Sequence, residues 1–169
     1  MNKMDIKLKQ WNLKDRFDLI RICNEVDRSW LRGTIPYPYT EKDAEWYIGM
    51  AREREGKDAL IRAIVADGEI VGNITLEQKG DIFVPDAELG YLLLPNYAGL
   101  GIASEAVAQL CALGFSQLSI RRITAQVCAP HVASCRVLEK NGFTLEGRMR
   151  DAVYVNRQLC DLLIYGKLK

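Results

Sequence analysis

One apolar stretch, followed by two glycines and a long helical pattern, constrains this chain more than any other feature. Residues 88–94 are short and apolar and end at Pro95, which is typical of a strand buried on both faces. Gly99 and Gly101 follow, and beyond them apolar residues recur at helical spacing, at Ile102, Ala106, Leu110 and Leu113. The sequence therefore predicts a buried strand, a tight turn and a helix that begins at the turn.

A glycine turn at the start of a helix favours binding of a phosphate or pyrophosphate. The first backbone N–H groups of the helix point in one direction, with the positive end of the helix dipole behind them. A simpler interpretation stays open, in which Gly99 and Gly101 only make a tight connection. A dinucleotide fingerprint, Gly-x-Gly-x-x-Gly, fits poorly, because Ser104 stands at the third glycine position and no repeated strand–helix–strand pattern surrounds it.

Length and composition narrow the classes of protein to consider. The 169 residues suit a single domain over 1–169, and a hydrophobic content of 49% with 27% charged residues is typical of a soluble globular protein. The net charge of +1 carries no basic stripe, and no apolar run reaches membrane-spanning length or forms a signal peptide. We therefore expect a cytoplasmic protein with neither a nucleic acid nor a membrane as partner.

Five scattered cysteines and one histidine lack the spacing of metal ligands, so no metal site is predicted. We expect the thiols to be reduced and mostly buried. One alternative stays open, in which Cys128 or Cys135 is a nucleophile with His131 as its base.

The remaining patterns complete an α/β chain. Predicted strands cover residues 4–11, 60–66, 69–76, 88–94, 122–128, 143–149 and 158–168. Asn12 and Thr40 are expected to cap the first two helices, the third begins at Ile102, and the fourth runs from Pro130 to a stop at Gly142. Asp67 and Gly68 form the residue pair preferred in a tight hairpin turn. We expect one domain with a mostly antiparallel sheet of about seven strands and four helices.

Three segments, in this order of the chain, resemble the GCN5-related N-acetyltransferase (GNAT) family. Residues 30–48 resemble the substrate-side loop and second helix of its RimJ/RimL-like branch, which acetylates protein N-termini. Asn96-Tyr97-Ala98-Gly99-Leu100-Gly101 is similar to its pyrophosphate loop, Q/R-x-x-G-x-G/A, except at Asn96. Residues 131–147 are similar to its N-x-x-S-x-x-V-L-E-K-x-G-F segment, with His131 in place of the asparagine.

The resemblance implies a GNAT fold, with a twisted central sheet that is splayed at strands 4 and 5. It implies an N-acetyltransferase that takes acetyl-CoA as its co-substrate and needs no metal. A primary amine, of a peptide or protein N-terminus or of a small molecule, would attack the thioester directly in a ternary complex. A homodimer is a further family expectation.

The resemblance also assigns site residues. The predicted cofactor-binding residues are Leu92, Leu93, Leu94, Asn96, Tyr97, Ala98, Gly99, Leu100, Gly101, Ile102, Ala103, His131, Ser134 and Lys140. Glu88 is the candidate general base, acting through water, and Ser134 is the candidate donor to the thioester sulfur. Trp30, Tyr37 and Tyr39 are the candidate walls of the acceptor pocket.

Each assignment has a structural alternative. Glu88 then only bonds its neighbours, Ser134 bonds back to the preceding turn, Lys140 belongs to a solvated basic face, and Trp30 packs in the core.

Two departures from the family pattern keep other functions open. Leu138 stands where many relatives have a tyrosine, and Val153 lies in the stretch after the sixth strand where the ribosomal branch has a glutamate. These departures favour a non-catalytic acyl-CoA-binding sensor as the main alternative. A structural or interaction module whose glycine loop binds nothing is the second.

Overall fold

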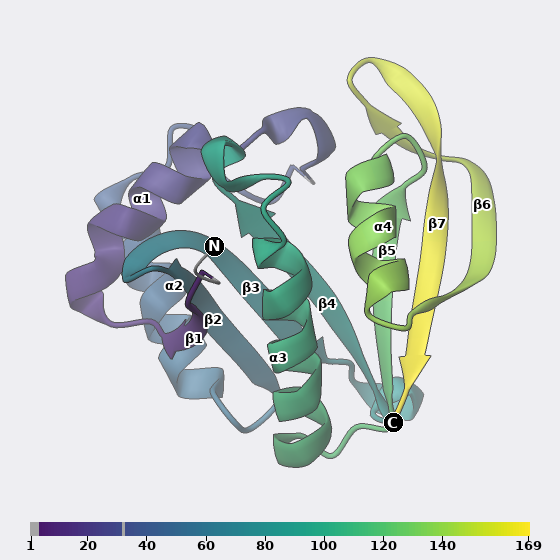
Figure 1. Cartoon of the computed structure of the whole chain (residues 1–169), viewed down its shortest axis with the longest axis horizontal. Coiled ribbons are helices and arrows are strands. Elements are labelled where there is room, and N and C mark those ends of the chain that lie inside the picture. Colours follow the sequence, from purple (N-terminus) through teal and green to yellow (C-terminus); the bar gives the residue numbers. More distant parts are fainter. Residues whose placement is uncertain (1–3, 32) are drawn as a thin grey trace.

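Strands arranged as a single sheet, in the order β1-β2-β3-β4-β5-β7-β6, carry helices on both faces (Figure 1). The computed structural model describes residues 4–31 and 33–169. Within these ranges the strands are β1 (Ile6–Gln10), β2 (Ala59–Ala66), β3 (Glu69–Gln78), β4 (Asp86–Leu93), β5 (Arg122–Cys128), β6 (Thr144–Val155) and β7 (Gln158–Leu168). The helices are α1 (Arg16–Glu25), α2 (Glu41–Arg54), α3 (Ile102–Gln117) and α4 (Val132–Lys140). The α/β class and the mostly antiparallel sheet are confirmed.

Local capping chemistry explains where the first helices begin. The Asn12 side chain accepts from the backbone N–H of Lys14, and Asp15 returns a bond to the N–H of Asn12. This capping box opens a short 3-10 turn that leads into α1. Thr40 and Asp43 make the same reciprocal pair at the start of α2. The predicted Thr40 cap is confirmed, whereas Asn12 caps the 3-10 turn that precedes α1 and not α1 itself.

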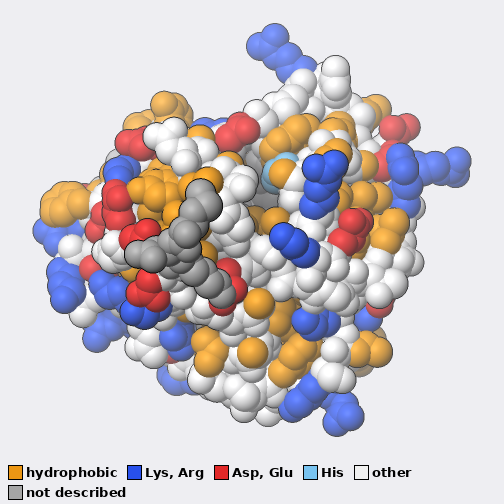
Figure 2. Space-filling view, in the orientation of Figure 1, with side chains coloured by type: hydrophobic (Ala, Val, Ile, Leu, Met, Phe, Trp, Pro, Cys, Tyr) orange, Lys and Arg blue, Asp and Glu red, His pale blue; other side chains and the backbone are white. Residues whose placement is uncertain are grey.

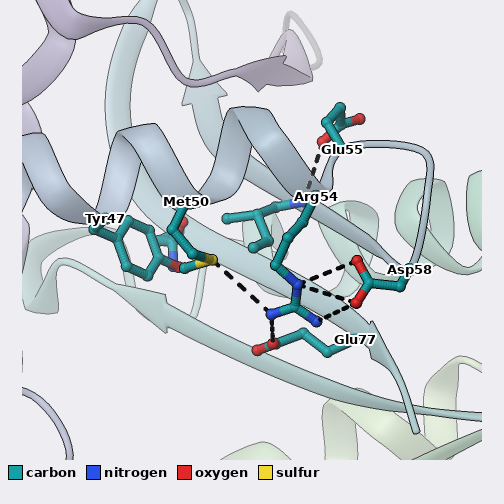
Figure 3. A network of polar contacts seen from close by, with 8 residues as sticks. Tyr47, Met50, Arg54, Glu55, Asp58 and Glu77 are labelled. Atoms are coloured by element: carbon teal, nitrogen blue, oxygen red, sulfur yellow. Dashed lines mark hydrogen bonds and ion pairs between the residues drawn. The ribbon is translucent and has the colours of Figure 1, made fainter. Parts of the chain in front are cut away.

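The sheet separates two hydrophobic cores. One lies under α3 and α4, and the other lies under α1 and α2. Polar contacts attach α2 to the sheet (Figure 3): the Arg54 guanidinium donates to Asp58 and, over 2.6 Å, to Glu77 on β3. The hydroxyl of Tyr47 accepts from Asn73 on β3 over 2.8 Å. The helices of this face are therefore held to the sheet by polar as well as apolar contacts.

The parallel pair β4 and β5 separates partway along its length. The two strands pair only from Asp86 opposite Arg122 to Leu89 opposite Ala125. Beyond that point β4 continues against β3 as far as Leu93, whereas β5 continues against β7. Figure 1 shows the two strands diverging from a common end. The splay predicted at strands 4 and 5 is confirmed, and we call the space between the diverging strands the strand gap.

The sixth strand is longer than predicted. It runs to Val155 rather than Met149, because a bulge between Met149 and Val153 lets pairing with β7 resume. Asp151 takes a positive φ of 46° within the bulge. Val153, which the sequence places after the strand, therefore lies inside β6 opposite Cys160.

The predicted hairpin turn and the predicted free, mostly buried thiols are found in the structure. Asp67 and Gly68 both take positive φ, as a tight primed turn requires. The five cysteines carry free thiols, four of them buried. Among the described residues, no helix is both long and apolar enough to cross a membrane.

Candidate active site

The glycine loop lies between a short 3-10 turn, Pro95–Tyr97, and the first residue of α3. Gly99 has a φ of +77° and Gly101, the residue before the helix, has a φ of +81°. A Cβ added to either glycine would meet no atom within 4 Å, so the backbone conformation and not crowding requires glycine here. The same openness leaves the backbone of the loop accessible to a ligand.

The start of α3 offers backbone donors beside this loop. The N–H groups of the first helical turn have no partner within their own helix, and they include those of Ile102, Ala103 and Ser104. The Ile102 side chain is fully buried, so only its backbone can serve a ligand. Ser104 is not among the predicted cofactor-binding residues, but its backbone N–H belongs to this first helical turn. The site suits an anion such as a pyrophosphate.

Helix α4 adds positive charge near the same place. The Asn141 amide, just beyond α4, donates to the carbonyl oxygen of Ser104 over 3.1 Å and so joins the end of α4 to the start of α3. Lys140 and Arg136 are exposed on α4. Figure 2 shows Lys and Arg side chains over this part of the surface, beside a hollow between the two halves of the molecule.

Tyr97 anchors the loop. Its hydroxyl donates to Glu69 over 2.6 Å, and Glu69 also accepts from Arg21 on α1. The hydrogen bond from Tyr97 lowers the pKa of the Glu69 carboxyl. The hydroxyl of Tyr97, a predicted cofactor-binding residue, is thus engaged within the protein, and it holds the loop against the hairpin of β2 and β3.

The backbone hydrogen-bonding groups of β4 point alternately toward β3 and toward β5. The N–H of Leu94 donates to the carbonyl oxygen of Val71 on β3 over 2.9 Å. The antiparallel register places Leu92 opposite Asn73, two residues along, in the same hydrogen-bonded set. The backbone groups of Leu92 and Leu94 therefore point toward β3. The N–H of Leu94, a predicted cofactor-binding residue, is thus engaged within the sheet. Leu93 and, unpredicted, Tyr91 direct their backbone groups into the strand gap.

A buried pair of hydroxyls connects β4 to α4. The Tyr91 phenol oxygen lies 2.8 Å from Ser134 Oγ, in the first turn of α4. Burial raises the pKa of the Tyr91 phenol, and the hydrogen bond to Ser134 partly offsets that effect. Ser134 is 9% exposed, so it lies beside the gap and not on the solvated face of α4. Side chains alternate along β4, so Tyr91 lies on the same face as Leu89. This alternation is the signal in the sequence that would have placed Tyr91 near the site.

Glu88 lies on the opposite face of the sheet. It sits on β4 in register with Thr124 on β5 and Glu77 on β3, just before the strands diverge. Because side chains alternate along a strand, Glu88 shares its face with Leu92 and not with Tyr91. Glu88 and Ser134, the two predicted catalytic residues, are therefore placed on opposite faces of the sheet near the closed end of the gap.

An open groove of about 440 Å³ follows the face that carries Glu88. Its walls include Phe83 from the β3–β4 connection, Asp86 on β4 and Gln126 on β5. The buried Asp86 carboxylate accepts from Thr124 over 2.7 Å and from Lys79 over 2.6 Å. Glu88 does not line the groove, but it lies on the same face of β4, two residues beyond Asp86.

The predicted aromatic wall is only partly assembled. Trp30 stacks on His131, at the start of α4, with ring centroids 5.4 Å apart and an interplanar angle of 13°. Tyr37 is exposed, with the Arg28 guanidinium over its ring. Tyr39 is 7% exposed in the core under α1 and α2, so its prediction as a pocket wall is wrong. Its place before the Thr40 cap draws it inward with the helix.

His131 does not cap α4 with its side chain. The described contact of its ring is the stack on Trp30. That contact joins the connection between α1 and α2 to the start of α4. It places Trp30 beside the site, but it does not support the alternative in which His131 activates a thiol.

The half-buried imidazole of His131 makes stability depend on pH. Burial lowers the pKa of His131 below its usual 6.5, and the charge of Asp27 opposes this only in part. Its contribution to stability is therefore present above the unfolded value and is lost as the pH falls through the folded-state pKa. We expect the free energy of unfolding, measured by urea denaturation from pH 7.5 to pH 5.5, to fall more in the wild type than in His131→Asn. Equal losses in the two proteins would contradict this.

Comparisons with known proteins agree with this geometry. The family model described as the acetyltransferase (GNAT) domain matches residues 5–144. YdaF of Bacillus subtilis (strain 168), which carries the name of a ribosomal N-acetyltransferase, is 32% identical over 118 residues, or 70% of this chain. The chain spans 64% of that relative, less than two thirds of its length.

A second relative and a solved structure extend the likeness over more of the chain. The ribosomal-protein-serine acetyltransferase of Escherichia coli (strain K12) is 25% identical over 87% of this chain and 83% of its own length. The structure of Mycobacterium smegmatis RimJ in complex with CoA-disulfide superposes with a TM-score of 0.82 at 22% identity. The superposition covers 96% of this chain and 81% of that one, and it shows a shared fold.

Proposed function

The chain belongs to the GNAT acetyltransferase family, and from that premise we propose that it transfers the acetyl group of acetyl-CoA to a primary amine. One observation carries the proposal. The pairing of β4 with β5 ends at Leu89 and Ala125, and the glycine loop and the start of α3 follow directly from the end of β4. A ligand whose extended pantetheine arm leads to a pyrophosphate matches a strand gap with an anion site at its mouth.

The described residues fit acetyl-CoA as the co-substrate. The backbone around Gly99 and Gly101 and the first turn of α3 would hold the pyrophosphate. The amides of the pantetheine arm would pair with the backbone of Leu93 and Tyr91, as an added strand pairs with a sheet edge. Lys140 and Arg136 would contribute charge. The likeness to the structure of Mycobacterium smegmatis RimJ in complex with CoA-disulfide supports this choice of ligand.

The two catalytic candidates have distinct roles in the transfer. A neutral amine forms a bond to the thioester carbon, its proton passes through water to Glu88, and the bond from carbon to sulfur breaks. A backbone N–H in the gap stabilises the charge that develops on the carbonyl oxygen. Ser134 donates a hydrogen bond to the departing sulfur, and the thiolate then takes a proton from solvent. Because Glu88 and Ser134 lie on opposite faces, amine and thioester can approach from opposite sides.

The acceptor is an α-amine of a peptide or protein, or a small-molecule amine. Free α-amines have a pKa of about 7.7–8.0, against about 10.4 for lysine. A larger fraction of an α-amine is therefore neutral near pH 7, so a weaker base is sufficient to remove its proton. The name of the Escherichia coli relative supports a peptide with N-terminal serine as the first acceptor to test. The groove beside Glu88 is where we place the acceptor.

Thermal unfolding with and without acetyl-CoA tests the cofactor site. A ligand at about 100 times its dissociation constant stabilises a protein by roughly 2.7 kcal/mol, which raises the Tm of a domain of this size by about 5–10 °C. We expect that shift with acetyl-CoA and not with adenosine. An unchanged Tm at every acetyl-CoA concentration would leave the glycine loop as a structural turn and overturn the proposal.

Release of the CoA thiol then separates an enzyme from an acyl-CoA-binding sensor. The acceptors are hexapeptides with free N-terminal serine, alanine or methionine, together with small primary amines. We expect thiol release with at least one of them, and a Glu88→Gln variant that keeps the Tm shift but loses about 100-fold in kcat. A Tm shift without turnover on any amine would favour the acyl-CoA-binding sensor.

A further inference from the structure

The hydroxyl pair of Tyr91 and Ser134 crosses from strand to helix at the strand gap. Tyr91 lies two residues beyond Leu89, the last residue of β4 that pairs with β5. Its backbone faces the gap, and its side chain reaches α4, where the two hydroxyl oxygens are 2.8 Å apart. No other described contact joins the free part of β4 to the first turn of α4 by a side-chain hydrogen bond.

We propose that Tyr91 is a positioning residue for the transfer step, which donates to Ser134 Oγ so that the Ser134 hydrogen points to the thioester sulfur. The inference rests on the proposed function and deepens it, since it adds the residue that orients the sulfur's donor. No bond to Tyr91 forms or breaks, and its proton stays on the phenol throughout.

The direction of the hydrogen bond follows from the two groups. A phenol is a much stronger acid than an alkyl alcohol, so it is the stronger donor, and the serine oxygen is the stronger acceptor. Burial raises the pKa of Tyr91, which keeps the phenol protonated at neutral pH. Ser134 then accepts from Tyr91 and retains its own hydrogen for another acceptor.

The backbone acceptors nearest to Ser134 are already engaged. A serine in a helix commonly donates back to the carbonyl oxygen three or four residues earlier. Here the carbonyl oxygen of Pro130 accepts from the N–H of Val132 over 2.9 Å, and that of His131 accepts from the N–H groups of Ser134 and Cys135. The described hydrogen bond of Ser134 Oγ is the one with Tyr91, and no described bond runs from it to either carbonyl oxygen, so its hydrogen is left for a ligand atom in the gap.

Kinetics of thiol release by the full chain test this assignment. With the best amine of the panel, we expect Tyr91→Phe to lower kcat about 10-fold and to leave the KM for acetyl-CoA unchanged. Ser134→Ala should lower kcat by at least as much. The double variant should be no slower than Ser134→Ala, because Tyr91 acts only through that serine.

Tyr165→Phe is the matched control. Tyr165, on β7, also places its hydroxyl against α4, where it donates to Glu139 over 2.9 Å and contacts the Cys135 thiol, but it makes no described hydrogen bond to Ser134. We expect the Tyr165→Phe variant to lose a hydroxyl hydrogen bond to α4, as Tyr91→Phe does, and to keep the wild-type kcat. A loss of kcat equal to that of Tyr91→Phe would show that loosening α4 is sufficient and would overturn the assignment.

Failure of this inference differs from failure of the proposed function. Wild-type kcat in Tyr91→Phe, a rise in KM alone, or additive losses in the double variant would overturn the role of Tyr91 and leave the acetyl transfer standing. A wild-type protein that releases no thiol with any amine would overturn the proposed function, and the role of Tyr91 with it.

Discussion

Gly101→Val is expected to lower the affinity for acetyl-CoA by about 100-fold or more. Glycine at this position has a φ of +81°, and its missing side chain leaves open space above the loop. A valine would place its methyl groups where the pyrophosphate must approach the N–H groups of α3. Loss of two charge-assisted hydrogen bonds, at about 1.5–3 kcal/mol each, accounts for this loss of affinity. Isothermal titration calorimetry with acetyl-CoA measures it.

Gly56→Val separates this effect from backbone strain. Gly56 follows α2 and has a φ of +73°, and a Cβ added there would also meet no atom within 4 Å. An L-residue in this conformation costs about 1–2 kcal/mol at either glycine. We expect both variants to lose similar stability and only Gly101→Val to lose acetyl-CoA binding. Wild-type affinity in Gly101→Val would contradict the placement of the pyrophosphate.

Gly72→Ala is expected to destabilise the protein by about 2–3 kcal/mol. The added Cβ would lie closer to the carbonyl oxygen of Leu92, a backbone atom of the neighbouring strand, than van der Waals contact allows. It would also lie 3.1 Å from Ile64 on the other side. Because β3 is paired with both β2 and β4, it cannot move away from both, and the crowding is not relieved by a rotamer change. Urea denaturation measures the free energy of unfolding.

Gly90→Ala is the control on the adjoining strand. Its Cβ would lie 3.4 Å from the Thr75 hydroxyl, an ordinary contact, and Gly90 is exposed. Alanine also restricts the unfolded chain, so we expect a change within about 0.5 kcal/mol of zero or a small gain. Equal stabilities of the two variants would show that β3 and β4 can separate without cost. Since β4 carries the backbone of the strand gap, Gly72→Ala should also weaken acetyl-CoA binding.

Structural features that are set by neighbouring residues in the chain can be predicted from the sequence. The caps Asn12 and Thr40, the hairpin turn at Asp67 and Gly68, and the positive φ of Gly101 each depend on a few consecutive residues. The order of strands and helices follows from the same local signals. The predicted fold is therefore confirmed almost element by element.

Features that depend on register cannot be predicted from the sequence in the same way. Whether Leu93 or Leu94 faces the strand gap is decided by the pairing of β4 with β3, and a slip of one residue reverses it. Aromatic residues cluster around Tyr39 in the sequence and suggest a pocket wall, whereas its position before a capped helix buries it. Tyr91 carries no local signal of its role, since only the folded chain brings it to Ser134.

The strand gap gives the sheet an interior edge, with consequences for what can add to it. An unpaired strand at the outside of a sheet can recruit a strand of any other chain and so promotes aggregation. The unpaired part of β4 instead faces β5 and α4, and the two strands converge toward Leu89 and Ala125. A polypeptide strand would need a spacing of about 4.7–4.9 Å to each neighbour, together with room for its side chains. Because the two strands converge, we expect the unpaired part of β4 to be less accessible to a strand of another chain than an outer edge of the sheet would be.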